Sequence, residues 1–365
     1  MKNKVVWFQP PMYPVNHYFF NSLSIYIDLV VYQIGDHPNF HIENIIFSDR
    51  HYELRVLNDF TYHNRKNYSL NFLKYLKKDN PDIVVSVAFW VPSFYLSLAK
   101  CFLKFKLVIT TDATNFTETN LGTFRKYFRR FISKRTDHFI GASQLTKFYL
   151  SQFKEEEYIS ISRQTVHTAK WMEESINSSS KEVLRENLGF PQNKKIILGV
   201  GRFEKRKNWE HVFRNLEYLS EEYYFILVGE GGLKNTYEEM INNKDLASKV
   251  SLLPWIDNSQ MISLYLAADF FVFPTLSDHF GFVVPEALSC GLPVICSSNA
   301  GASEFIIDGF NGYVIHPDED FQDLIYKISQ NYEFFTENAK KMAAENTLEK
   351  RAEQHMSIIE KILSQ

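Results

Sequence analysis

One stretch decides the fold of this chain: residues 270–312 read FFVFPTLSDHFGFVVPEALSCGLPVICSSNAGASEFIIDGFNG. The stretch opens with an apolar run, 270–273, which is typical of a short buried strand. A polar loop and a helix-like pattern follow, and Gly291 is the residue type that often ends a helix. A second apolar run, 292–296, predicts the next strand. Strand, loop, helix and strand in this order predict part of a parallel sheet covered by helices.

The start of the predicted helix, at Gly281, Phe282 and Val283, is a candidate anion site. Backbone N–H groups at a helix start lack partners within the helix and carry a partial positive charge. In a parallel sheet the following helix starts beyond the carboxyl end of the strand, where such folds bind ligands. Two acids accompany it, Asp278 just before the helix and Glu286 eight residues further on.

This stretch resembles the signature of family-four retaining glycosyltransferases, also called glycosyl transferases group 1, which have the GT-B fold. Their pattern is close to PS-x-x-E-x-F-G-x-x-x-x-E-A, and residues 274–287 read PTLSDHFGFVVPEA. The GLPVI run at 291–295 and the glycines of 301–312 continue the resemblance. Asp278 stands where the family has Glu, which is a departure. The resemblance implies an α/β protein with two doubly wound Rossmann-like domains that face a central cleft.

The composition is that of a globular enzyme-sized chain. With 365 residues, 45% apolar and 23% charged, it has room for about two domains with large cores. The net charge of −3 gives no sign of a nucleic-acid partner. Three cysteines without framework spacing are typical of a reducing compartment, and we find no signal peptide or membrane-span pattern. We therefore expect a cytoplasmic protein, with peripheral contact to the inner face of the membrane as an option.

Strand and helix patterns alternate through both halves of the chain. We expect an N-terminal Rossmann-like acceptor-binding domain at 1–165 and a C-terminal Rossmann-like nucleotide-sugar-binding domain at 166–345. Residues 163–195, with their serines and acids, are interpreted as the connection. The last segment, 346–365, is predicted to be a helix that packs back on the first domain. A strand is also expected at 42–47.

A second motif, GVGRFEKRKN at 199–208, follows a predicted strand and opens a helix. Its glycines, Gly201 included, let the backbone approach a phosphate, and its cations supply donors. A dinucleotide fingerprint would need glycine at 204, where the chain has Glu204. The motif resembles the G-R-x-x-x-x-K-G/N segment of the same family. By that resemblance Arg202 and Lys207 bind the donor diphosphate, whereas the alternative is a solvated basic turn.

The resemblance also assigns the remaining donor contacts. Glu286 would accept hydrogen bonds from the ribose hydroxyls. Asp278 and the backbone N–H groups of 281–283 would face the donor sugar, and the alternative for Asp278 is a helix-capping acid. Glu230, in the turn Glu230-Gly231-Gly232, and Ile256 match positions near the nucleotide and its base.

The first domain carries two weaker candidates. His17 lies in a first loop that resembles P-x-x-x-H/Y-x-x-x-x-F of one subgroup, so it is expected to contact acceptor or phosphate, or to cap a helix. Asp112 follows the predicted strand 106–110 and can orient or deprotonate an acceptor hydroxyl. The alternative for Asp112 is a turn-forming role.

The helix predicted at 124–135 is basic and aromatic. Phe124, Tyr127, Phe128, Phe131 and Ile132 share one face, and six Lys or Arg residues come without an acid. Such a helix can lie on an anionic membrane surface. It can also pack its apolar face on a core and point its cations to solvent.

We expect neither a metal nor a cofactor. The histidines of the first half lack ligand spacing. The run Asp318-Glu319-Asp320 matches D-x-D formally, but its place before a helix favours N-terminal capping. A GT-B site can neutralise the leaving diphosphate with Arg202, Lys207 and the helix start at Gly281.

The resemblance implies transfer of a hexose-type sugar, with retention, from a nucleotide-diphosphate sugar to a hydroxyl acceptor. We expect UDP rather than GDP as the nucleotide, and a carbohydrate or lipid-linked carbohydrate as the acceptor, in cell-surface polysaccharide or glycolipid biosynthesis. Two alternatives stay open at this point. One is a sugar-nucleotide epimerase on the same fold, and the other is a non-catalytic partner subunit that binds the nucleotide.

Overall fold

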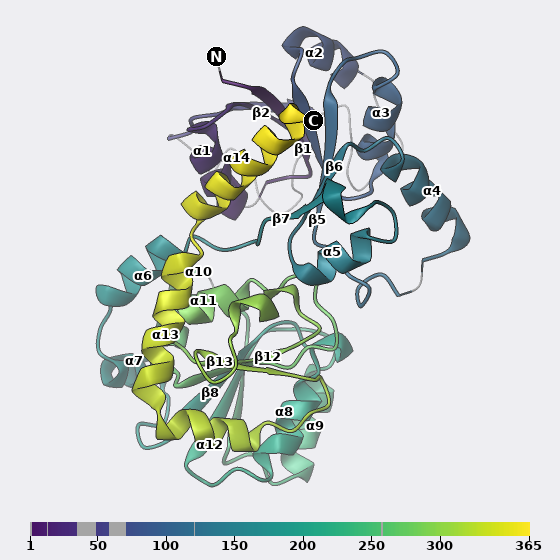
Figure 1. The fold of residues 1–365 in the computed structure, drawn as a ribbon. Coiled ribbons are helices and arrows are strands. Elements are labelled where there is room, and N and C mark those ends of the chain that lie inside the picture. Colours follow the sequence, from purple (N-terminus) through teal and green to yellow (C-terminus); the bar gives the residue numbers. More distant parts are fainter. Residues whose placement is uncertain (1, 13, 35–48, 58–70, 120, 257) are drawn as a thin grey trace. The chain divides into compact units, whose positions relative to one another are not determined.

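The computed structural model describes residues 2–12, 14–34, 49–57, 71–119, 121–256 and 258–365 (Figure 1). The chain forms two compact units. The first unit consists of Met1–Gln164 together with Leu348–Gln365, and the second unit consists of Thr165–Thr347.

The first unit is a seven-stranded sheet with the order β3-β2-β1-β4-β5-β6-β7. All of its strand pairs are parallel. This order, which reverses between β1 and β4, is that of a doubly wound Rossmann sheet. Its elements are β1 (Lys4–Gln9), α1 (Pro14–Ser24), β2 (Asp28–Ile34), β3 (Glu53–Leu57), α2 (Phe72–Asp79), β4 (Ile83–Val87), α3 (Val91–Ala99), β5 (Lys106–Thr111), α4 (Thr123–Ser133), β6 (His138–Gly141), α5 (Gln144–Leu150), η2 (Glu156–Tyr158), β7 (Ile159–Ile161) and α14 (Leu348–Ser364).

Alternation along β1 builds the core of the first unit on both faces of the sheet. Val5 and Trp7 belong to one buried cluster, which also contains residues of α1 and α14. Val6 and Phe8 belong to a second cluster, formed with residues of α2 and α3. Successive side chains of a strand point to opposite faces, so a continuous apolar run is needed where both faces are covered.

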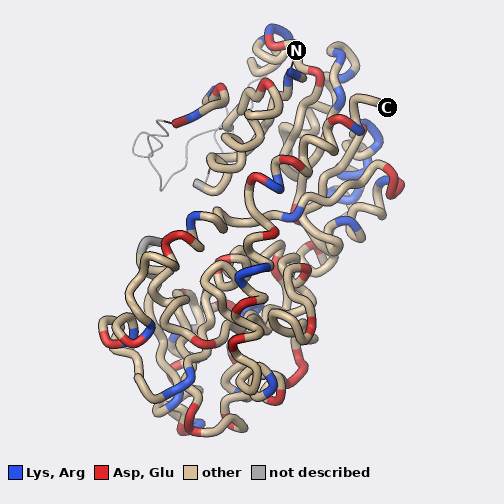
Figure 2. Tube along the Cα trace, turned by 60° about the vertical axis from the view of Figure 1, so that its left-hand side comes forward, with Lys and Arg blue, Asp and Glu red and all other residues tan. Residues whose placement is uncertain are grey.

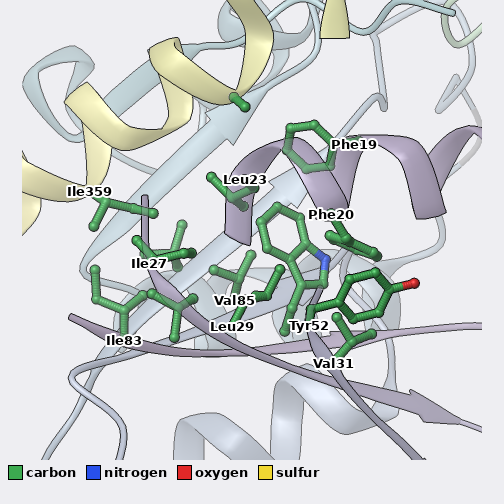
Figure 3. Close-up of a cluster of buried hydrophobic side chains, with 14 of the residues drawn as sticks. Phe19, Phe20, Leu23, Ile27, Leu29, Val31, Tyr52, Ile83, Val85 and Ile359 are labelled. Carbon is green, nitrogen blue, oxygen red and sulfur yellow. The ribbon is translucent and has the colours of Figure 1, made fainter. Parts of the chain in front are cut away.

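The C-terminal helix α14 is part of the first unit, although nearly the whole second unit precedes it in the sequence. It lies beside α1, and Figure 3 shows Ile359 near Leu23 and Ile27 in the same apolar cluster. Arg351 of α14 stacks its guanidinium over the Phe19 ring, 4.1 Å from the ring centre. α14 therefore completes the core on that face of the sheet.

The second unit is a six-stranded sheet with the order β10-β9-β8-β11-β12-β13. Its strand pairs are also parallel, and the order reverses between β8 and β11. Its elements are α6 (Thr168–Ile176), α7 (Lys181–Leu188), β8 (Lys195–Val200), η3 (Lys205–Lys207), α8 (Trp209–Leu216), β9 (Tyr223–Val228), α9 (Lys234–Asn243), β10 (Val250–Leu253), α10 (Asn258–Ala267), β11 (Phe270–Phe273), α11 (Val283–Ser289), β12 (Val294–Ser297), η4 (Gly301–Phe305), β13 (Gly312–Ile315), α12 (Gln322–Gln330) and α13 (Tyr332–Glu345).

The interpretation of 163–195 as a connection is wrong, because this stretch contains α6 and α7 and belongs to the second unit. Buried Arg185 of α7 forms an ion pair with Asp269, 2.5 Å from guanidinium nitrogen to Oδ2. Asp269 also accepts the backbone N–H of Ile196, the second residue of β8, at 2.7 Å. The Asp269 side chain thus links α7 to β8. The polar composition of these helices, which bury few residues, hides them in the sequence.

Three further elements were not expected from the sequence. β3 is a partly exposed strand with charged residues, and α5 has seven residues, about two helical turns, so neither gives a long apolar run or a sustained helical pattern. β13 begins at Gly312, the last glycine of the 301–312 segment. The strand expected at 42–47 lies outside the described residues.

The sheet reversal of the second unit brings two loops to one edge. The loop after β8 and the loop after β11 leave the carboxyl ends of neighbouring strands. Open α/β sheets bind their ligands in the crevice at such a reversal. Both sequence motifs, 199–208 and 274–287, occupy these loops.

Candidate functional site

The two loops of the second unit are joined by an ion pair. The ammonium nitrogen of Lys207 lies 2.6 Å from Oδ2 of Asp278, and a guanidinium nitrogen of Arg206 lies 3.1 Å from the same oxygen. The Lys207 and Asp278 side chains are only 10% and 15% exposed. The backbone supports this contact, because Leu276 donates its N–H to the carbonyl oxygen of Arg206 at 2.8 Å.

Burial and charge set the protonation of this pair. Burial lowers the pKa of Lys207, and the facing charge of Asp278 offsets that effect only in part. Burial alone would raise the pKa of Asp278, but Lys207 and Arg206 outweigh it and lower that pKa. Asp278 is therefore ionised at neutral pH. Arg206 also pairs with Glu204 at 3.0 Å, and Glu204 pairs with Arg202, so three cations share two carboxylates and the cluster keeps a net positive charge that can meet an anion.

The contacts of Asp278 decide whether it caps the helix that follows it, α11. The first residue before α11 is Phe282, and no side chain caps the helix. Asp278 instead pairs with the cations of the other loop, so the helix-capping alternative is wrong. Arg206 was not predicted as a site residue, although it lies within the same basic run as Lys207. Its contact with Asp278 spans 72 positions in sequence, which no local pattern reveals.

Three glycines pack the loop after β8 against the loop after β9. A Cβ added to Gly229, whose φ is +154°, would lie 2.1 Å from the carbonyl oxygen of Gly201. A Cβ on Gly231 would lie 2.5 Å from the carbonyl oxygen of Phe203. The N–H of Phe203 in turn donates to the carbonyl oxygen of Glu230 at 2.8 Å. Close approach of two backbones is the physical reason for glycine at these positions.

The loop before α11 also needs a glycine. Gly281 has a φ of +100°, and a Cβ there would lie 2.7 Å from the ring of Phe273. The same Phe273 ring faces Lys207, whose ammonium nitrogen is 4.7 Å from the ring centre. Gly281, Phe273 and Lys207 thus form one packed corner beneath the two loops. The predicted N–H donors of Gly281, Phe282 and Val283 stand at the start of the seven-residue α11.

Glu286 lies on α11, and its carboxylate accepts a hydrogen bond from the Tyr265 hydroxyl at 2.9 Å. Burial raises the pKa of Glu286 to about 7, against the opposing effect of that hydrogen bond. Tyr265, on α10, was not predicted as a site residue. A carboxyl group with a pKa near 7 changes its hydrogen-bonding character within the physiological range.

The other predicted residues of the second unit lie at its surface. Arg202 is 73% exposed on its side chain and pairs with Glu204 at 2.9 Å. Glu230 is exposed in its turn, and Ile256 is partly exposed after β10. Their contact with a nucleotide stays a prediction.

The two candidates of the first unit differ in their surroundings. His17, on α1, is buried, with Nδ1 3.0 Å from the Tyr52 hydroxyl and Nε2 3.2 Å from Asp49. Burial lowers the pKa of His17, although the hydrogen bond with Asp49 works against this. Asp112 follows β5 directly and is partly buried. Their roles toward an acceptor stay predictions.

Two searches of the described residues gave negative results. Over those residues, no cluster of three or more His, Cys, Asp or Glu side chains is placed to hold a metal ion. None of the described helices is both long and apolar enough to cross a membrane.

The segment that contains the two loops resembles a known protein family. Residues 180–347 match the family model for glycosyl transferases group 1. The likeness to this family therefore covers most of the second unit. The matched segment contains the Lys207–Asp278 pair and both motif loops.

Two proteins resemble part of this chain in sequence. An uncharacterized glycosyltransferase of Methanocaldococcus jannaschii is 30% identical over 146 residues, or 39% of this chain and 37% of that protein. Alpha-monoglucosyldiacylglycerol synthase of Streptococcus pneumoniae is 25% identical over 229 residues, or 60% of this chain and 52% of that protein. The matches thus span only about a third to a half of these relatives' length.

A solved structure extends the likeness in fold to nearly the whole chain. Alr3699/HepE of Anabaena, crystallised in complex with UDP, has a TM-score of 0.78 at 16% identity and covers 98% of this chain and 100% of that chain. The GT-B fold expected from the sequence is confirmed by the two doubly wound sheets and by this likeness.

Proposed function

We propose that the protein is a glycosyltransferase that moves a hexose-type sugar from a nucleoside-diphosphate sugar to a hydroxyl acceptor. The observation that carries the proposal is the Lys207–Asp278–Arg206 cluster at the sheet reversal of a group 1 domain. A buried ammonium group held beside a second cation suits a diphosphate, whose charge grows as the sugar leaves. The carboxylate of Asp278 keeps Lys207 in place.

The proposed reaction retains the configuration at the sugar's anomeric carbon. The bond from that carbon to the diphosphate oxygen breaks, and a bond to the acceptor oxygen forms on the same face. The acceptor proton passes to the leaving phosphate. Lys207 and Arg206, with the N–H groups at the start of α11, balance the charge on the diphosphate, so the proposal needs no metal ion.

UDP is the nucleotide that we propose for the donor. Support comes from the fold, since a protein of the same fold was crystallised with UDP. A thermal-shift panel of UDP, GDP and ADP, with and without EDTA, tests this choice, because a ligand of the folded state raises the melting temperature by mass action. We expect a clear rise with UDP that EDTA leaves unchanged. No rise with any nucleotide would favour a chain that has lost donor binding and would overturn the proposal.

The affinity for UDP is expected to rise with pH because of Glu286. Ribose hydroxyls donate to the ionised carboxylate, whereas burial favours the protonated form and raises the pKa of Glu286 to about 7. Binding must therefore displace a proton below pH 7. At pH 6 only about a tenth of the groups are ionised, so the UDP dissociation constant should be about tenfold higher than at pH 8.

Titration calorimetry from pH 6 to 8 measures this effect, and Glu286→Gln is the matched control. The UDP phosphate also titrates in this range, so only the part of the pH dependence that disappears in the variant belongs to Glu286. Identical slopes in both proteins would remove Glu286 from the ribose site.

We further propose that α4 of the first unit rests on an anionic membrane surface. The helix is divided along its length: Ile132 is buried and Phe128 and Phe131 pack on the first unit's core, whereas Phe124 and Tyr127 are 81% and 66% exposed. The apolar face expected from the sequence is therefore packed over the C-terminal part of the helix and exposed at Phe124 and Tyr127, near its start.

The cations of α4 are divided in the same way. Arg129 is used internally, paired with Glu118 at 2.9 Å and placed over the Phe89 ring. Arg125, Lys126 and Arg130 are exposed beside Phe124 and Tyr127. Exposed aromatic rings among exposed cations match the interface of an anionic bilayer. The name of the Streptococcus pneumoniae relative, a synthase of a glycosylated diacylglycerol, supports a lipid-linked acceptor as one choice.

Replacing Phe124 and Tyr127 together by alanine should lower binding to phosphatidylglycerol vesicles about tenfold or more, since two exposed rings no longer enter the interface. Vesicle flotation measures the bound fraction. Phe148→Ala, which removes another exposed ring of the first unit (68% exposed), is the control and should bind as the unaltered protein does. Equal binding of all three proteins would refute the membrane role of α4.

A further inference from the structure

The first unit contains a cationic pocket at the edge of the sheet opposite to the carboxyl ends of its strands. The pocket lies where the chain enters the strands: Lys106 begins β5, Asp137 precedes β6 and Tyr158 precedes β7. Its volume is about 440 Å³. It is lined by Lys100, Lys106, Lys134, Arg135, Thr136, Asp137, Lys154, Glu157, Tyr158, Ile362 and Gln365.

Two of the lysines form contacts within the first unit that hold them in place. Lys100 pairs with Asp137 and donates to the carbonyl oxygen of Arg135 at 2.9 Å. Lys154 donates to the carbonyl oxygen of Thr136 at 3.0 Å and lies over the Tyr158 ring. Both carbonyl groups lie just after the end of α4, where the helix dipole places partial negative charge. These two lysines therefore form the wall of the pocket.

Of the other three cations, Arg135 places its guanidinium over the Phe131 ring, 4.0 Å from the ring centre. Within the described ranges, neither Lys106 nor Lys134 nor Arg135 forms an ion pair. Asp137, one of the two acids of the lining, is used by Lys100 and by the N–H of Leu107 at 2.6 Å. The arrangement thus gathers five positive side chains around one cavity with two acids. Figure 2 shows Lys and Arg positions close to the C-terminal end of the chain, where Ile362 and Gln365 line the pocket.

Like charges gathered around a cavity destabilise the fold unless an anion or solvent ions screen them. Three unpaired Lys and Arg side chains present several N–H donors to the same space, which is the chemistry that holds phosphate. Phe102, in the loop between Lys100 and Lys106, is 88% exposed. An exposed ring in a loop that supplies two of the cations also suits a phosphate carried by a lipid.

We propose that this pocket binds a phosphate group, as a second anion site of the protein, apart from the Lys207 cluster of the second unit. The shared chemistry is a phosphate ester or diphosphate. Its source is either a soluble phosphate compound or the headgroup of an anionic lipid.

Cys101 gives a local reporter for this pocket. It follows Lys100 directly and is exposed, whereas the other two cysteines, Cys290 and Cys296, are buried in the second unit. A thiol-reactive trifluoromethyl label on the full chain therefore attaches beside a residue of the pocket lining and reports on the pocket by fluorine NMR. One arm of the experiment titrates inorganic pyrophosphate at constant ionic strength. The other compares phosphatidylglycerol vesicles with phosphatidylcholine vesicles.

The expected result is a saturable change of the fluorine signal in at least one arm. Lys106→Gln with Arg135→Gln should weaken that response about tenfold or more, because two charge-assisted contacts are lost. Lys134→Gln, at an exposed position that does not endanger folding, should weaken it several-fold. Lys104→Gln, an exposed lysine outside the lining, is the matched control and should keep the full response.

The arms distinguish the two sources. A response to pyrophosphate alone identifies a soluble phosphate ligand, and a response to phosphatidylglycerol alone identifies a lipid headgroup. A signal that changes only linearly with added salt, or that is the same in the Lys106→Gln/Arg135→Gln protein, would overturn the proposal. Circular dichroism of each variant confirms that the fold is kept.

Discussion

Lys207→Ala is expected to abolish most glycosyl transfer and to weaken the binding of UDP about 100-fold. The Lys207 ammonium group is the buried cation of the cluster, 8% exposed as a residue, and among the residues that the structure describes no other buried cation lies between Asp278 and Phe273. A lost contact to a charged group is worth about 1.5–3 kcal/mol in binding. Losing charge compensation for a departing anion costs about 10²–10³ in turnover. Titration calorimetry and donor turnover measure the two effects.

The same change also leaves the Asp278 carboxylate partly unpaired, so the fold must be tested separately. Removing one partner of a buried pair costs up to about 3 kcal/mol here, since Arg206 still faces Asp278. The double variant Lys207→Ala/Asp278→Ala should recover part of that stability but none of the UDP affinity. Lys205→Ala, at the exposed neighbouring position, is the control and should leave both quantities unchanged. A double variant that also recovers UDP binding would show that Lys207 acts only through the fold.

Gly229→Ala is expected to lower the free energy of unfolding of the second unit by about 3 kcal/mol or more. The new methyl group would lie 2.1 Å from the Gly201 carbonyl oxygen, and the φ of +154° is unfavourable for any residue with a side chain. Overpacking and backbone strain each cost about 1–3 kcal/mol. The loop after β8 must move to relieve the contact, so UDP binding should fall with stability. Urea unfolding and calorimetry measure both.

Gly232→Ala is the matched control, three positions further along the same turn. A Cβ at Gly232 meets no atom within 4 Å. This variant should unfold at the same urea concentration as the unaltered protein. If Gly229→Ala behaved like Gly232→Ala, the close packing of the two glycine loops would be refuted.

The parts of the fold that the sequence predicts are those with strong local patterns. The apolar runs 270–273 and 292–296 correspond to β11 and β12, two buried strands of the second sheet. The alternation of strands and helices predicts two parallel sheets, and both are found. The sequence also predicts where the two motifs lie, because every loop that follows a strand of a parallel sheet leaves at the carboxyl edge of that sheet.

What the sequence does not predict depends on contacts between distant residues. Lys207 and Asp278 are 71 positions apart, and nothing in either motif shows that one binds the other. α7 is polar along most of its length, and its place in the second unit depends on the Arg185–Asp269 pair, 84 positions apart. For His17 the sequence allows either a contact with the acceptor or phosphate, or helix capping. Its hydrogen-bond partners, Tyr52 and Asp49, come from a distant segment that the local pattern does not reveal. Local patterns carry no information on such pairs.

The central claim, that the Lys207 cluster binds the diphosphate of a sugar nucleotide, is tested most directly by one calorimetric series. Uridine, UMP, UDP and UDP-glucose are titrated into the intact protein with EDTA present. We expect UDP to bind much more tightly than UMP, at one site per chain. In Lys207→Ala this difference between UDP and UMP should disappear. Equal affinities for UMP and UDP, or no binding of any of the four, would contradict the claim.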